Sequence, residues 1–280
     1  MEIVKSNIGL LDTSVQIDRK KSKHWSDHVD EELQKLSWTV ATGISLVEFK
    51  AVLIQECITI HNKLFQQKKY SLARDSLIES THRQNRLRAH IFNNILDVHG
   101  SSYSLTPAED TKLAERARLL LEVHILELYK WFRTRSTSAF LNPIKCNRAE
   151  EPPKKKKAAY EANLPICKRG VNKTCLVESF LRDNCRKILI QLEQVDFDSE
   201  QLTKSIEIAE SVLSQESMQL SVSDCRSMGD LLIVLEAGSQ STHALSTNKR
   251  DWKPLAECAG LELVIITHQG KSKQSSDPEV

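Results

Sequence analysis

LVEFKAVLIQECITIHNKLF, residues 46–65, is the stretch that decides the fold class. Its apolar residues recur at steps of three and four in two adjacent stripes: Leu46, Phe49, Leu53, Cys57, Ile60 and Leu64, then Val47, Ile54, Ile58 and Phe65. This spacing is typical of an α-helix, and two stripes side by side indicate burial on most of the helix circumference. The pattern therefore predicts a helix at the centre of a bundle.

Helical periodicity extends over most of the chain. The clearest helix start is at Thr106, where Pro107 and Glu109 complete a capping box. Only 8 glycines and 7 prolines interrupt the 280 residues, too few for the frequent turns of an all-β protein. The other segments with helical periodicity are 29–40, ended or bent by Gly43, then 70–78, 83–98 and 106–133, and, in the second half, 174–192 and 199–213.

Two short apolar runs near the end of the chain differ from this pattern. Leu231–Leu235 fits either a buried strand or the inner face of a helix, because the run is too short for its periodicity to decide. Leu261–Thr267 favours a strand through its β-branched residues. The predicted fold class is therefore mainly α: a multi-helix bundle, a basic linker and a smaller helical C-terminal unit, which carries a two-stranded β element if both runs are strands.

A lysine run separates the two halves of the chain. Glu150–Lys157 reads EEPPKKKK; its prolines oppose helix continuation, and its four adjacent like charges oppose compact packing. Lys154, Lys155, Lys156 and Lys157 also have the composition of a nuclear-import signal, which predicts a nuclear protein. The predicted division is a flexible segment 1–27, a helical bundle domain 28–141, a basic linker 142–172, a C-terminal domain 173–268 and a disordered tail 269–280.

Charge and cysteine content restrict the class of protein. With 39 basic and 37 acidic residues, the chain lacks the excess of positive charge of a strongly basic nucleic-acid-binding domain, although a local basic face remains compatible. Charge interrupts the first residues, so no secretory signal is expected and the 7 cysteines are predicted to be reduced thiols. No run of about 18 apolar residues occurs, and no membrane partner is predicted.

No catalytic or metal-binding signature can be identified in the sequence. His24 and His28 share a helical spacing but lack a third ligand. The remaining candidate ligands are Cys225, His243, Cys258 and His268. Their spacings do not match the close pairs of zinc modules, and the common phosphate-binding loops are absent from the sequence. The sequence thus predicts a non-enzymatic protein without cofactor, metal or small-molecule substrate.

The function predicted from these features is a scaffold or adaptor subunit of a nuclear multiprotein complex, whose helical surfaces accept amphipathic segments of partner proteins. Tryptophan is enriched at interface hot spots, which makes the four tryptophans candidate anchors: Trp25, Trp38, Trp131 and Trp252. The alternative is a DNA- or RNA-binding factor that uses the linker lysines and one basic side of the helix 83–98. That side carries His82, Arg83, Arg86 and His90.

Overall fold

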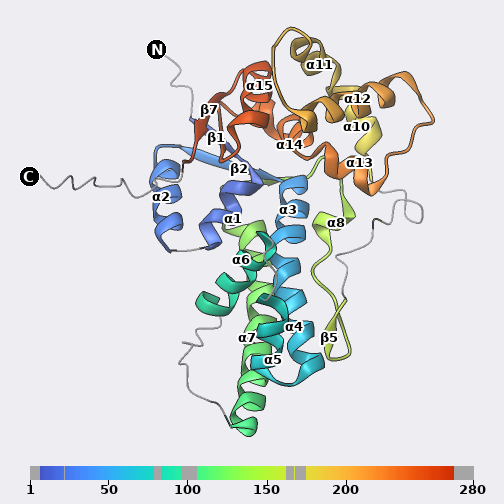
Figure 1. Cartoon of the computed structure of the whole chain (residues 1–280). Coiled ribbons are helices and arrows are strands. Elements are labelled where there is room, and N and C mark those ends of the chain that lie inside the picture. Colours follow the sequence, from blue (N-terminus) through green and yellow to red (C-terminus); the bar gives the residue numbers. More distant parts are fainter. Residues whose placement is uncertain are drawn as a thin grey trace, which may run out of the picture.

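The computed structural model of the chain describes residues 7–21, 23–78, 83–95, 106–161, 167 and 175–267. Five short strands in it form one parallel sheet, in the order β3-β2-β1-β6-β7 (Figure 1). The mainly α class predicted from the sequence is therefore wrong, and the fold is α/β. The strands are β1 (Ile8–Leu11), β2 (Trp38–Thr42), β3 (Ala139–Leu141), β6 (His243–Ser246) and β7 (Glu262–Ile265).

Burial on both faces explains why periodicity did not reveal the sheet. In β1, Leu10 belongs to the main hydrophobic core and Leu11 to a smaller core on the other side, and both are fully buried. A strand buried on both faces is a short continuous apolar run, without the alternation that identifies a half-buried strand. β1 and the helix α1 (Thr13–Lys21) both lie in the segment 1–27 that was expected to be flexible.

The segment 29–40, predicted as a single helix, contains a helix and a strand. The helix α2 (Lys23–Gln34) ends six residues early, and β2 begins at Trp38. Val40, Ala41 and Thr42 are buried, and β2 pairs with β1 on one side and β3 on the other. Parallel hydrogen bonding to two distant segments overrides the local helical spacing, and sequence periodicity contains no information about such partners.

The central helix predicted over residues 46–65 is confirmed. It is a continuous rod of α3 (Gly43–Phe49), a π-helical turn (Lys50–Ile54) and α4 (Gln55–Gln67), which starts where β2 ends and extends away from the sheet (Figure 1). Phe49 packs on Phe132 with ring centroids 4.9 Å apart. This rod and the helices that pack around α4 form what we call the helical arm. Those helices are α5 (Tyr70–Ile78), α6 (Arg83–His90) with the π-helical turn Ile91–Ile95, and α7 (Pro107–Thr134).

The start of α7 is the one predicted from its capping box. The Thr106 side chain accepts a hydrogen bond from the Glu109 backbone N–H, while the Glu109 carboxylate accepts one from the Thr106 backbone N–H at 2.8 Å. Two N–H groups that lack helical partners are thereby satisfied. From this start α7 runs 28 residues, with Ala117, Leu121 and Ile125 on its buried face.

The C-terminal half supplies two strands of the sheet, β6 and β7, and helices α14 and α15 that pack on it. Leu231–Leu235 is helical, inside α14, whereas the strand predicted at 261–267 is confirmed as β7, which pairs with β6. The sheet draws three strands from before residue 142 and two from after residue 172. The helices of this half are α8 (Asn147–Glu150), α10 (Val177–Asn184), α11 (Arg186–Leu192), α12 (Glu200–Ser214), α13 (Val222–Ser227), α14 (Gly229–Ala237), a 3-10 turn (Gly238–Gln240) and α15 (Lys249–Ala259). Among the described residues, no helix is both long and apolar enough to cross a membrane.

The two faces of α7 predict opposite responses to leucine truncation. Leu121 is fully buried, so Leu121→Ala is expected to lower the free energy of unfolding by about 2 to 4 kcal/mol through lost burial and the cavity left behind. Leu119, two residues earlier, is 52% exposed, and Leu119→Ala is expected to change it by less than about 0.5 kcal/mol. Urea unfolding measures both; equal losses would contradict this orientation of α7.

Candidate functional site

The order in which the chain adds strands to the sheet reverses at β1. From β1 the chain adds β2 and β3 on one side and later β6 and β7 on the other. In open α/β sheets, ligands bind outside the carboxyl ends of the strands at such a switch point. Asp12 follows β1 directly, and the Ser246 hydroxyl at the end of β6 donates a hydrogen bond to its Oδ2 at 2.7 Å. The buried Asp12 carboxyl therefore lies at the position where this topology favours a ligand.

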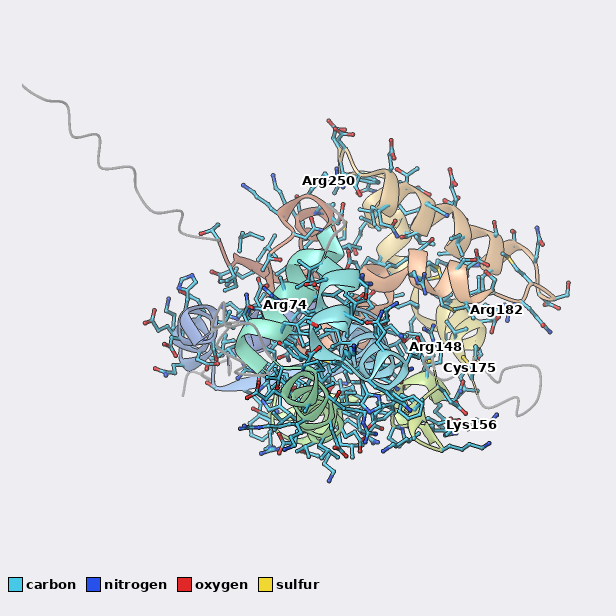
Figure 2. All side chains as sticks on the ribbon, turned by 60° about the horizontal axis from the view of Figure 1, so that its bottom comes forward. Arg74, Arg148, Lys156, Cys175, Arg182 and Arg250 are labelled. Atoms are coloured by element: carbon cyan, nitrogen blue, oxygen red, sulfur yellow. The ribbon has the colours of Figure 1, made fainter. Side chains whose placement is uncertain are left out.

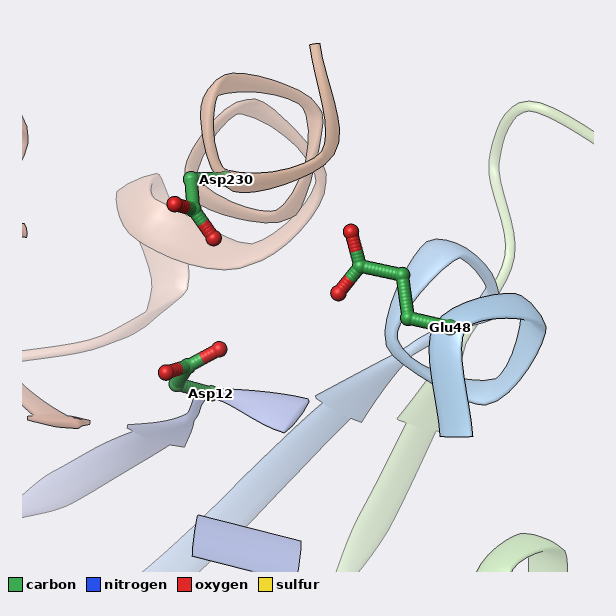
Figure 3. A group of neighbouring side chains, drawn as sticks. All are labelled: Asp12, Glu48 and Asp230. Atoms are coloured by element: carbon green, nitrogen blue, oxygen red, sulfur yellow. The ribbon is translucent and has the colours of Figure 1, made fainter. Parts of the chain in front are cut away.

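Two further carboxyl groups face Asp12. Glu48 comes from α3 and Asp230 from the first turn of α14, and Figure 3 shows the three side chains directed into one space. One carboxylate oxygen of each lies within 4.8 Å of one from each of the others. Residues 12, 48 and 230 are far apart in sequence, so only the sheet and the helices that follow its strands bring them together.

The glycine that starts α14 makes room for Glu48. A Cβ atom placed on Gly229 would lie 1.9 Å from Glu48 Oε1, well inside van der Waals contact. On the other side, the Thr13 hydroxyl donates to Glu48 Oε2 at 2.6 Å. The Glu48 carboxyl is therefore held between the N-terminus of α14 and the residue that follows Asp12.

Burial disfavours the ionised form of all three acids, and neighbouring negative charges add to this effect for Glu48 and Asp230. Burial raises the pKa of Asp12, although hydrogen bonds from Ser14 and Ser246 partly offset the rise. Burial, with the nearby Asp12 charge, raises the pKa of Glu48 to about 7. Burial and the charges of Asp12, Glu48 and Asp251 raise the pKa of Asp230 well above its ordinary value. A cation placed among the carboxylates would reverse each of these effects.

The three acids line the wall of a cavity of about 750 Å³. Arg148, Arg226 and Cys175 line the same cavity. Valines from α13 and the π-helical turn, Val222 and Val52, form part of its partly exposed apolar lining. The site thus combines a cluster of three carboxyl groups with two guanidinium groups that line the same cavity.

Hard divalent cations are the ions that suit this cluster of three carboxyl groups. Mg²⁺ and Mn²⁺ prefer carboxylate oxygens and water, and octahedral ligand oxygens about 2.1 Å from Mg²⁺ lie roughly 3 to 4 Å apart. The carboxylate oxygens of Asp12, Glu48 and Asp230 lie within 4.8 Å of one another, so they would have to approach one another slightly to reach this range. Three carboxylates leave the remaining coordination positions to water or substrate, which is the arrangement that metal-assisted hydrolysis requires.

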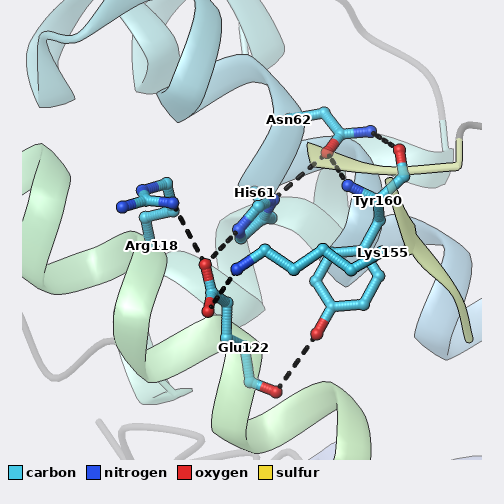
Figure 4. Close-up of polar contacts among 6 residues, drawn as sticks. All are labelled: His61, Asn62, Arg118, Glu122, Lys155 and Tyr160. Atoms are coloured by element: carbon cyan, nitrogen blue, oxygen red, sulfur yellow. Dashed lines mark hydrogen bonds and ion pairs between the residues drawn. The ribbon is translucent and has the colours of Figure 1, made fainter. Parts of the chain in front are cut away.

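The lysine run predicted as a linker forms a hairpin of β4 (Lys155–Lys156) and β5 (Ala159–Tyr160). All four lysines are exposed, and Figure 2 shows the Lys156 side chain at the periphery of the molecule. The hairpin is fixed to the arm through Lys155, whose ammonium lies 2.7 Å from a Glu122 carboxylate oxygen (Figure 4). Glu122 also contacts His61 at 3.0 Å and Arg118 at 3.1 Å, and the Asn62 amide exchanges two hydrogen bonds with the Tyr160 backbone.

The predicted nucleic-acid contacts fall largely outside the described residues. His82 lies outside them, and the side chains of Arg83 and Arg86, on α6, do so as well. His90 is described, at the end of α6, and has an interaction partner. The structure therefore leaves this basic side of the helix as a prediction.

The four tryptophans occupy different environments and do not form one surface. Trp252 is fully buried, and Trp131 is half-buried against Phe49 with the Lys20 ammonium 4.0 Å from its ring centroid. Trp38 is 51% exposed at the start of β2. The Trp25 side chain lies outside the described residues. Of the described tryptophans, Trp38 is thus the one placed to serve as an anchor.

The histidines and cysteines considered as metal ligands do not form a site in the described part of the chain, where the acidic group is the one cluster suited to a metal. His28 lies 3.9 Å from Glu31, and His243 lies 3.3 Å from Glu262. Cys258 is buried on α15, and Cys225 lines the cavity. The His24 side chain and all of His268 lie outside the described residues.

Sequence reasoning missed all three acids of the cluster. Each nevertheless lies in or next to an apolar stretch: Asp12 follows IGLL, Glu48 lies within LVEF, and Asp230 precedes LLIVL. An isolated carboxylate among apolar residues is costly to bury, so it is a signal of function. The sequence does not show that the three acids belong together, because their proximity depends on the strand order.

Raised acid pKa values predict a protein that loses stability as pH rises. The folded state keeps a proton on Glu48 that the unfolded chain releases between pH 4.5 and about 7, so the free energy of unfolding falls across this window. Glu48→Gln should therefore be about 1 to 3 kcal/mol more stable than the wild type at about pH 8 without a cation. Denaturant unfolding across pH measures this effect.

Glu236 supplies the matched control for this prediction. Burial raises its pKa to about 7 as well, but its carboxylate accepts a hydrogen bond from the Ile44 backbone N–H and is not part of the cluster. Mn²⁺ should stabilise the wild type and Glu236→Gln at about pH 8 and leave Glu48→Gln nearly unchanged. An equal response of all three proteins would exclude the cluster as the cation site.

Comparison of the chain with family models, curated proteins and solved structures gave no match.

Proposed function

We propose that the protein is a hydrolase that uses a divalent cation to cleave phosphodiester bonds of nucleic acid. The observation that carries this proposal is the convergence of Asp12, Glu48 and Asp230 within 4.8 Å at the carboxyl end of the sheet. Burial of the three carboxyl groups raises their pKa values, the charges of neighbouring acids add to this for Glu48 and Asp230, and the result costs stability. A fold retains such a cost where function requires it, and binding of a cation offsets it.

The chemistry follows from the charges around the cavity. A bound divalent cation would polarise a phosphoryl oxygen and lower the pKa of a coordinated water. Asp12, Glu48 and Asp230 would hold this cation, and the Thr13 and Ser246 hydroxyls fix two of the carboxyl groups for that task.

The two arginines favour a phosphate substrate. Arg148 and Arg226 line the cavity, and a guanidinium group matches the geometry of phosphate oxygens with two parallel hydrogen bonds. Within the part of the chain that the structure describes, neither forms an ion pair with a carboxylate. A polyanionic strand could therefore contact both arginines while one of its phosphates faces the three acids.

Cleavage of labelled RNA and DNA oligonucleotides, single- and double-stranded, tests the proposal. The wild type should cleave at least one of them with Mg²⁺ or Mn²⁺ and lose activity on chelation. Asp12→Asn, Glu48→Gln and Asp230→Asn should each lower the rate by about 100-fold or more, because each removes a ligand of the cation. Glu236→Gln should retain most of the activity. Absence of calorimetric Mn²⁺ binding, or cleavage that survives chelation, would contradict the proposal.

The carboxylate cluster favours an enzyme over the non-enzymatic scaffold predicted from the sequence. A role in a nuclear complex remains a proposal of ours for surfaces outside the cavity, and exposure of the four lysines of the β4–β5 hairpin favours it. Import receptors read accessible basic side chains. A nucleic-acid partner, the alternative function predicted from the sequence, agrees with the proposed hydrolase.

Nuclear accumulation should depend on the three lysines other than Lys155, whose ammonium pairs with Glu122. We expect Lys154→Ala, Lys156→Ala and Lys157→Ala together to abolish accumulation of a fluorescently tagged chain. Lys155→Ala removes the ion pair with Glu122 and leaves three lysines, so it is expected to have the smaller effect on location. Unchanged nuclear fluorescence of the triple variant would disprove the import signal.

A further inference from the structure

Lys50 is a lysine in the interior of the molecule. It begins the π-helical turn Lys50–Ile54, two residues after Glu48, and only 1% of its surface is exposed. Removal of an ammonium group from water is costly unless acceptors surround its protons, so lysine is rarely buried completely. The burial of Lys50 therefore requires specific partners.

The partners of Lys50 are backbone carbonyl groups at the C-terminal end of α8. The Lys50 ammonium donates one hydrogen bond to the Arg148 carbonyl oxygen and a second, of 2.6 Å, to the Glu151 carbonyl oxygen. It also lies 5.3 Å from the centre of the Tyr129 ring. A positive charge at the last carbonyl groups of a helix is favourable, so Lys50 fixes this end of α8.

The helix α8 depends on contacts of this kind, because the four residues Asn147–Glu150 are too few to form a stable helix alone. Tyr129, on α7, donates its hydroxyl to the Glu150 carbonyl oxygen at 2.5 Å. At the start of α8, the Asn142 side-chain oxygen accepts a hydrogen bond from the Cys146 backbone N–H at 3.2 Å. Side chains from outside α8 therefore hold it at both ends.

Arg148 lies within α8 and lines the cavity that contains the three acids. Lys50 is not among the described residues that line this cavity, so its ammonium does not reach a ligand there. Lys50 and Glu48 belong to one continuous rod. This rod thus places one acid of the cluster directly and, through Lys50, holds the backbone from which the Arg148 side chain extends.

We propose that Lys50 is a positioning residue for Arg148. By holding α8 against the rod, it keeps the Arg148 guanidinium at the cavity wall, where this group binds a phosphate of the substrate. The inference rests on the proposed hydrolase function, which makes Arg148 a phosphate contact. A contact group that is already in place loses less conformational freedom on binding, so affinity depends on Lys50 although Lys50 does not touch the substrate.

Oligonucleotide binding to the full-length protein tests the inference, with EDTA present to prevent metal-dependent cleavage. The probes are labelled RNA and DNA, single- and double-stranded, and fluorescence anisotropy measures Kd. Arg148→Ala and Lys50→Met should each weaken binding by about tenfold or more. The double variant should bind within about twofold of Arg148→Ala alone, because Lys50 acts through Arg148 and the two losses are not additive.

Cleavage kinetics with Mg²⁺ give a second measurement. Lys50→Met should raise KM by about tenfold and change kcat by less than about threefold, whereas loss of an acid of the cluster lowers kcat. Tyr129→Phe is the milder variant, because it removes one hydrogen bond to α8 and keeps the ring. It should raise KM by about two- to fivefold.

Two control variants separate positioning from general effects. Leu121→Ala destabilises the core of the helical arm, and Lys130→Met removes the charge of an exposed lysine of α7. Neither residue lines the cavity. Both variants should therefore keep Kd and KM within about twofold of the wild type.

Additive losses in the double variant would overturn the inference, because they would mean that Lys50 acts on stability or on total charge and not through Arg148. Unchanged Kd and KM of Lys50→Met would overturn it as well. In both cases a wild type that cleaves with Mg²⁺ leaves the hydrolase proposal in place. A wild type that neither binds nor cleaves any of the oligonucleotides would reject the hydrolase and this inference together.

Discussion

The structure depends on the pairing of β1 with strands on both of its sides. Four residues, Ile8–Leu11, hydrogen-bond in parallel register to β2 about 30 residues later and to β6 about 235 residues later. Because Leu10 and Leu11 point into different hydrophobic cores, this strand also joins the two layers packed on the sheet. Removal of β1 would separate β2 and β3 from β6 and β7 and would leave Asp12 without a fixed position.

This pairing creates the electrostatic problem at the centre of the molecule. Strand β1 presents Asp12 at its end, β2 leads into the helix that carries Glu48, and α14 brings Asp230 against both. The helix N-terminus at Gly229 approaches so closely that a side chain there would displace the Glu48 carboxyl from its position. Three acids with raised pKa values therefore share a small volume, which lowers the stability of the fold. A cation bound among them would relieve this loss of stability.

The helical arm carries exposed apolar side chains on the outer face of α7, including Leu119, Val123 and Leu126. α4 and α7 pack along each other, so the inner face of α7 is used for folding and its outer face remains exposed. The β4–β5 hairpin lies against α4 and is fixed by Lys155 and Asn62. A residue run that is linker-like in composition is thus ordered by contacts with the arm, and its other lysines remain exposed on the hairpin.

Sequence by itself determined the features that depend on neighbouring residues. The rod through residues 46–65, the capping box at Thr106 and the strand near residue 263 follow from local spacing and hydrogen bonding, and all three are present. Position 29–40 shows the limit, because β2 is a strand only through its partners β1 and β3.

Only the tertiary structure decided the fold class and the candidate site. A parallel sheet joins segments that are distant in sequence, and its strands, buried on both faces, lack the alternation that reveals strands locally. For the same reason Asp12, Glu48 and Asp230 have no mutual spacing that could identify them. The sequence supplied three isolated carboxylates in apolar surroundings, and the strand order, a property of the whole chain, placed them within reach of one cation.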